Sequence, residues 1–182
     1  MRSRSAKSVC RASCSPADLA MLNVPFVCCS YSNRYGTLIE GEYSSVSIAD
    51  GDTAQQAVEE LYRHGHRRIA ALISRPNDQS ISQLRYEGYV QALESHGIPV
   101  DPELVISTGG FGAKDAYRAV QEKMAENVDF TALFAIADSM AIGAMRALMD
   151  AGRRIPEDCS VIAIDGLELS AYIEPPLTTL CQ

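Results

Sequence analysis

The clearest pattern in the chain lies between residues 130 and 180, where short apolar runs flank an amphipathic stretch. Residues 132–136 and 160–164 are apolar runs of the length that buried strands have. Between them, apolar side chains recur at i, i+3, i+4 and i+7: Ala141, Ala144, Met145 and Leu148. This spacing predicts one buried helical face, and Gly152 is placed to end that helix. The segment is therefore predicted to be a β-α-β unit of a parallel sheet.

The same alternation extends back toward the N-terminus. Amphipathic stretches at residues 50–64, 82–95 and 113–124 predict helices, and apolar runs at 69–73 and 104–106 predict strands between them. Two shorter runs, 26–29 and 46–48, predict further strands. The long runs are continuously apolar rather than alternating, which is typical of parallel strands covered on both faces. The sequence therefore predicts an α/β fold with a doubly wound parallel sheet.

Composition narrows the class of protein. The chain has 182 residues, of which 47% are hydrophobic and 21% charged, and this suits one soluble domain or slightly more. No apolar run is long enough to cross a bilayer, so we expect no membrane partner and a cytoplasmic location. The formal charge is −7 and the Lys and Arg residues are scattered, which argues against nucleic-acid binding by this chain itself.

Catalytic chemistry finds little support in the motifs. The six cysteines show no zinc or redox spacing, and we interpret Cys28 and Cys29 as small buried hydrophobes in a reducing compartment. Three histidines (His64, His66 and His96) lie at predicted helix ends, which indicates a structural role. No phosphate-binding loop, dinucleotide fingerprint or nucleophile elbow is present. We therefore expect no metal, no cofactor, no catalytic residues and no enzymatic activity.

A ligand site is predicted at one edge of the sheet. Ligands of open parallel sheets bind beyond the carboxyl ends of the strands. The residues that follow the predicted strands there are Ser30, Arg75, the turn containing Phe111, the pair Ala137–Asp138, and Asp165. Carboxylates and guanidinium groups bind hydroxyl groups, and an aromatic ring covers the apolar face of a sugar. These side chains favour a polyhydroxylated small molecule.

Each of these residues also has a structural interpretation. Asp138 begins a predicted helix, so a role as its N-cap is favoured over ligand contact. Asp165 follows a strand, and it suits a turn or a ligand contact equally well. Arg85 lies on a helix whose apolar side is already filled, which favours a surface ion pair. Phe111 lies among glycines that give its ring little to pack against locally.

Four segments, taken in order, resemble the LacI/GalR family of bacterial transcription regulators. They are GHRRIA (65–70), RYEGY (85–89), ADSMAIGA (137–144), and IPEDCSV (155–161) followed by DG (165–166) and PPLTT (175–179). The resemblance extends from about residue 24 to the C-terminus. It implies a type I periplasmic-binding-protein-like fold, in which two α/β subdomains hold a sugar or nucleobase effector between them.

The resemblance also implies roles for individual residues. Arg85 would bind effector hydroxyls or a carboxylate, Asp165 would accept hydroxyl hydrogens, and Phe111 would stack on the ring. Ser30 would reach the effector from the other subdomain. The family usually has Asn where this chain has Ala137, which predicts the loss of one polar contact.

The resemblance further implies a division of the chain. We expect a basic disordered leader at 1–15, a remnant of the N-terminal sensor subdomain at 16–33, and the C-terminal effector-binding subdomain at 34–182. No helix-turn-helix pattern is present, so operator binding and homodimer formation are expected of a full-length protein only. We expect weak or absent sugar binding by this chain alone. The implied function is effector sensing in a LacI-type regulator. The alternative is the solute-binding component of a sugar transporter, which the absence of a secretory signal disfavours.

Overall fold

The computed structural model describes residues 27–29, 44–75 and 81–182, which fall in two units, 1–47 and 48–182. In the first unit, β1 (Val27–Cys29) pairs in parallel with β2 (Ser44–Val46). The first of the two predicted short strands is confirmed, and the second forms two residues earlier than predicted. Ser30, the predicted leader and most of the predicted N-terminal remnant lie outside the described residues, as do the side chains of Cys28 and Cys29.

The second unit is built on a parallel sheet. Its five strands are β3 (Ile69–Ile73), β4 (Val105–Ser107), β5 (Ala132–Ala135), β6 (Ser160–Asp165) and β7 (Thr178–Cys181). Their order is β4-β3-β5-β6-β7, so the chain steps from β3 to one side and then returns to continue on the other. This reversal between β3 and β5 is the switch point of a doubly wound sheet, and the predicted fold class is confirmed.

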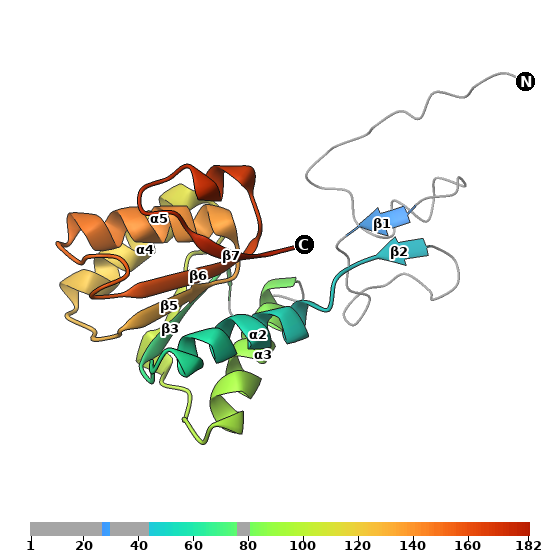
Figure 1. Ribbon diagram of the computed structural model, residues 1–182, viewed down its shortest axis with the longest axis horizontal. Coiled ribbons are helices and arrows are strands. Elements are labelled where there is room, and N and C mark those ends of the chain that lie inside the picture. Colours follow the sequence, from blue (N-terminus) through green and yellow to red (C-terminus); the bar gives the residue numbers. More distant parts are fainter. Residues whose placement is uncertain (1–26, 30–43, 76–80) are drawn as a thin grey trace, which may run out of the picture. The chain divides into compact units, whose positions relative to one another are not determined.

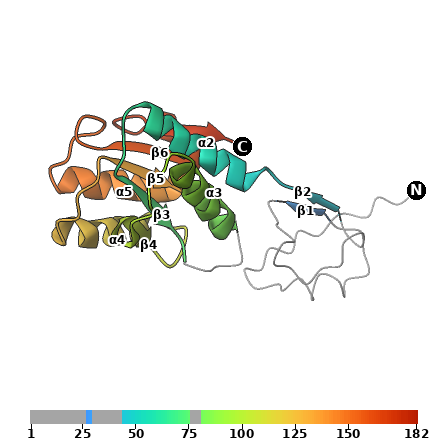
Figure 2. The ribbon, with the colours of Figure 1, turned by 90° about the horizontal axis from the view of Figure 1, so that it is seen from below.

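Helices cover both faces of this sheet. The helices α2 (Asp50–Arg63) and α3 (Ile81–Ser95) lie on one face, and α4 (Ala113–Ala125) and α5 (Asp138–Asp150) lie on the other (Figure 1, Figure 2). All four predicted helices are confirmed, and the apolar residues predicted to face the core from α5 are buried. Two short 3-10 helices, η2 (Pro102–Leu104) and η3 (Glu168–Ala171), were not predicted. No helix of the described segments is long and apolar enough to span a membrane.

Two glycines let the helices of each pair approach closely. A Cβ atom on Gly88 of α3 would lie 2.1 Å from the carbonyl oxygen of Gly51 in α2, and one on Gly143 of α5 would lie 2.0 Å from that of Ala113. Any other side chain would push the two backbones apart. The glycines of the RYEGY and ADSMAIGA segments are therefore explained by helix packing.

Candidate functional site

The centre of the site is the Arg85 guanidinium, which α3 carries to the carboxyl edge of the sheet. Its side chain is buried, so the predicted surface ion pair is wrong. Nε donates to Asp50 Oδ1 at 2.8 Å, and Nη1 donates to the carbonyl oxygen of Ile136 at 2.5 Å and to Asp165 Oδ1 at 3.2 Å. Arg85 therefore joins α2, the end of β5 and the end of β6 at one point.

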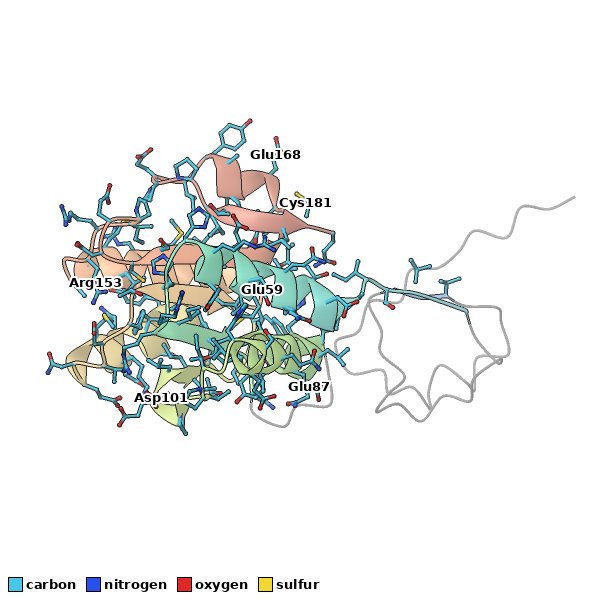
Figure 3. All side chains as sticks on the ribbon, turned by 60° about the horizontal axis from the view of Figure 1, so that its bottom comes forward. Glu59, Glu87, Asp101, Arg153, Glu168 and Cys181 are labelled. Atoms are coloured by element: carbon cyan, nitrogen blue, oxygen red, sulfur yellow. The ribbon has the colours of Figure 1, made fainter. Side chains whose placement is uncertain are left out.

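The topology explains why these groups meet. Because β3 and β5 are neighbours whose following helices leave to opposite faces, their carboxyl ends lie at the position where doubly wound sheets bind ligands. Arg85 is buried at this edge, while the side chain of Asp165 is 24% exposed. This edge lies at the end of the sheet marked by Cys181, and Arg153 lies at the opposite end (Figure 3).

Asp138 does not cap its own helix, so the predicted N-cap role is wrong. The N-cap residue of α5 is the buried Ala137, which makes no side-chain cap. The Asp138 carboxylate is fully buried and points instead at the segment after β6. It accepts hydrogen bonds from the Leu167 N–H (2.8 Å), Ser170 Oγ (2.7 Å) and Thr179 Oγ1 (2.5 Å). Asp138 therefore fixes the first half of β7 and the η3 segment against α5.

Asp165 takes the capping role that was predicted for Asp138. Its Oδ2 accepts from the backbone N–H of Asp138 at 3.3 Å, and its Oδ1 accepts from Gln182 Nε2 at 2.5 Å as well as from Arg85. Asp165 has a φ of 145°, a conformation that residues other than glycine rarely adopt. Such strain costs about 1–3 kcal/mol and persists only where surrounding contacts hold it.

The aromatic residue predicted for the site is tethered nearby through its backbone. The carbonyl oxygen of Phe111 accepts a hydrogen bond from Ser139 Oγ at 2.7 Å, which ties the glycine-rich turn to the start of α5. Phe111 is 43% exposed. The structure thus brings together five of the six predicted residues, Arg85, Asp165, Asp138, Ala137 and Phe111, at one edge.

Two contributors were missed at the sequence level. Asp50 was treated only as the start of a helix, and nothing in the local pattern shows that it pairs with an arginine 35 residues away. Gln182 follows a strand, β7, that was not predicted at all, because TTLC is short and half polar. A predicted β7 would have placed Gln182 at the carboxyl edge.

The opposite, amino edge of the sheet holds a different polar group. His66 Nδ1 contacts Thr131 Oγ1 and its Nε2 contacts Ser160 Oγ, both at 3.0 Å. Burial, with a smaller effect from His64, lowers the pKa of His66 below its ordinary value of 6.5. These contacts link the segments before β3 and β5 with the first residue of β6, beside a cavity of about 380 Å³. Within the described part of the chain, no group of three His, Cys, Asp or Glu side chains is placed to hold a metal ion.

Comparison with known proteins decides the family. A family model described as a periplasmic binding protein-like domain matches residues 58–182. The chain belongs to this family. The relatives of this chain also confirm the resemblance to LacI-type regulators. The chain is 38% identical to the HTH-type transcriptional repressor CytR of Escherichia coli K12 over 143 residues. That match covers 79% of this chain and 41% of CytR.

Further relatives of this periplasmic-binding-protein-like domain include a regulator and two solved structures. The HTH-type transcriptional regulator CelR of Thermobifida fusca is 35% identical over 167 residues, which are 92% of this chain and 48% of CelR. A CelR–cellobiose complex superposes with a TM-score of 0.77 at 35% identity, over 87% of this chain and 47% of that one. A LacI-family regulator from Enterococcus faecium with bound ribose gives 0.75 at 29% identity, over 91% and 59%.

The match to these relatives is partial along their length. The chain spans about two-fifths of the curated regulators MalR and CytR. These relatives are transcription regulators, which favours that class over an enzyme and over the solute-binding component of a transporter.

Proposed function

We propose that the chain is the effector-sensing part of a LacI-type transcription regulator and that its effector is a sugar or a related small molecule. The observation that carries this proposal is the Arg85–Asp165 pair at the switch point of the sheet. A buried guanidinium below a partly exposed carboxylate offers donors and acceptors at the place where this fold class binds ligands.

Each predicted site residue has a role in this proposal. Asp165 accepts hydrogens from effector hydroxyls, Arg85 supports it from below, and the exposed Phe111 ring covers the apolar face of the sugar. The small Ala137 leaves space where an amide would otherwise contact the ligand. Ser30 lies outside the described residues and stays a prediction for the effector site. Support comes from two related structures, one named as a cellobiose complex and one as containing ribose.

The remaining roles concern a whole regulator. In it, residues 34–182 form the C-terminal effector-binding subdomain and residues 16–33 belong to the N-terminal one. The regulator acts in the cytoplasm as a homodimer and contacts operator DNA through a helix-turn-helix, without catalysing a reaction. Effector binding shifts the dimer between DNA-competent and DNA-incompetent states, which couples the two sites.

A chimera tests this function. The matching segment of Thermobifida fusca CelR is replaced by this chain, and operator retardation is measured with cellobiose, ribose, maltose and adenosine. We expect the chimera to bind the CelR operator and at least one of these ligands to change its affinity. Asp165→Ala should abolish the response and leave DNA binding intact. A chimera that binds DNA and responds to none of the four, or responds equally with Asp165→Ala, contradicts the proposal.

A further inference from the structure

We propose that Asp50 makes this site selective for uncharged, hydroxyl-rich ligands and excludes anionic ones such as sugar phosphates and sugar acids. The inference rests on the proposed function, because it names the class of effector that the same site binds. Asp50 contacts no ligand in this account; it acts through Arg85 as a positioning residue.

Asp50 neutralises the guanidinium before any ligand arrives. It is the first residue of α2, and its Oδ1 accepts from Arg85 Nε at 2.8 Å, with both side chains only 4% exposed. Two opposite charges at this distance and depth interact strongly, because little water screens them. The positive charge of Arg85 is therefore matched inside the protein and is not left to attract an anion.

The hydrogen-bonding geometry of Arg85 also disfavours anionic ligands. An arginine grips a phosphate or carboxylate best through two adjacent nitrogens that act as a fork. Nε is bonded to Asp50, and Nη1 is bonded to Ile136 and Asp165. Among the described residues no partner is found for Nη2, so one nitrogen remains for a ligand. The two N–H groups of this nitrogen can donate to hydroxyl oxygens, but without a second free nitrogen beside it they cannot form the two-nitrogen fork that grips an anion.

Helix N-termini often bind anions, but two of the helices that begin at this edge, α2 and α5, have a carboxylate at their first turn. Asp165 Oδ2 accepts from the first N–H of α5, and Asp50 lies in the first turn of α2. Asp138 adds a third buried carboxylate whose partners are all neutral donors. One guanidinium among the three carboxylates Asp50, Asp138 and Asp165 leaves a net charge of −2, which repels anions and accepts hydroxyl hydrogens.

The test compares ribose with ribose 5-phosphate on the 182-residue chain. Proton–nitrogen NMR follows the Nε–H of Arg85 and the amide of Asp138 during each titration. We expect ribose to bind at least tenfold more tightly than ribose 5-phosphate. Asp50→Asn keeps an oxygen that accepts from Arg85 but removes the charge. It should lower the ratio of ribose affinity to ribose 5-phosphate affinity at least tenfold. Asp50→Glu should preserve it.

A control variant separates this effect from general charge. Asp52→Asn removes an exposed carboxylate from the same helical turn. It should not change the ratio of the two affinities. Wild-type chain that binds ribose 5-phosphate as tightly as ribose, or an Asp52→Asn effect equal to that of Asp50→Asn, overturns the inference.

A sulfate titration keeps the inference separate from the proposed function. Sulfate should leave the Arg85 Nε–H signal of the wild-type chain unchanged and should shift it in Asp50→Asn. If sulfate shifts that signal in the wild type, the inference fails regardless of the result of the sugar titrations. If neither sugar binds this chain but sulfate behaves as expected, anion exclusion by Asp50 stands, and the CelR chimera decides whether the sugar site is correct. Should Asp50→Asn not fold, as judged by circular dichroism, the wild-type responses to ribose 5-phosphate and sulfate decide the matter.

Discussion

The carboxylate of Asp165 accepts a hydrogen bond from the backbone N–H of Asp138 at 3.3 Å, so α5 is capped by a residue from the end of β6. The Asp138 side chain in turn holds the segment that connects β6 with β7. The two aspartates thus link the start of α5 to the end of β6 and to the first half of β7. A ligand that bonds to Asp165 acts directly on this link, which gives the proposed sensor a physical route from binding to movement.

Asp138→Ala should destabilise the fold without removing the proposed ligand contact. The substitution leaves the Leu167 N–H and the hydroxyls of Ser170 and Thr179 without their charged acceptor, and we expect a loss of about 2–4 kcal/mol in the free energy of unfolding. Urea denaturation followed by circular dichroism measures it. Asp52→Ala, an exposed acid in the first turn of α2, is the control and should change little. Equal effects of the two substitutions would refute the role assigned to Asp138.

Gly88→Ala and Gly51→Ala form a matched pair at the contact between α2 and α3. The new Cβ at position 88 meets the Gly51 carbonyl at 2.1 Å, and such overpacking should cost about 1–3 kcal/mol or more. At position 51 the nearest atom, the Leu84 carbonyl oxygen, lies at an ordinary 3.6 Å, and a helical Gly→Ala change should stabilise by about 0.5–1 kcal/mol. Thermal unfolding of both variants should therefore move in opposite directions. A stable Gly88→Ala variant would contradict the close packing of the two helices.

The fold of the second unit can be predicted well from the sequence, whereas the site can be predicted only in part. The helical faces of α2 and α5 follow from spacing alone, because a buried stripe needs apolar residues at helical intervals. The sequence predicts a surface position for Arg85, because no local pattern shows that Asp50, 35 residues earlier, pairs with it in the interior. It predicts a cap at Asp138, because that is the common role of an aspartate at a helix start. Its actual partners, 29 to 41 residues later, depend on how β7 pairs with β6.

The pH dependence of stability should report on His66. Its pKa lies below the ordinary 6.5, because burial and the neighbouring His64 disfavour the charged ring. The folded protein therefore binds fewer protons than the unfolded chain just below pH 6.5. Stability contributed by neutral His66 is complete above pH 6.5 and falls as the pH drops through the lower, folded-state pKa.

His66→Gln should flatten this part of the stability curve. The measurement is the urea midpoint between pH 7.5 and 5, together with the NMR titration of the His66 ring. A His66 pKa at or above 6.5 in the folded protein would disprove the expected direction.

The two described free cysteines should differ in reactivity. Burial raises the pKa of the Cys159 thiol to about 12, so almost no thiolate is present at pH 8, whereas Cys181 is exposed at the end of β7 (Figure 3). With N-ethylmaleimide at pH 8, peptide mass spectrometry should find Cys181 modified within minutes and Cys159 protected until urea is added. Rapid modification of Cys159 under native conditions would show that the residue directly before β6 is not buried as described.

The most direct test of the effector site is a map of amide NMR shifts as the 182-residue chain is titrated with ribose and cellobiose to tens of millimolar. The account predicts weak, saturable shifts centred on Asp138, Ser139 and Gly166 at the carboxyl edge, with Thr131 and Ser160 at the amino edge unaffected. Asp165→Asn should abolish these shifts and leave the rest of the spectrum in place. Shifts that centre on the amino edge, or that persist unchanged in Asp165→Asn, would contradict the central claim.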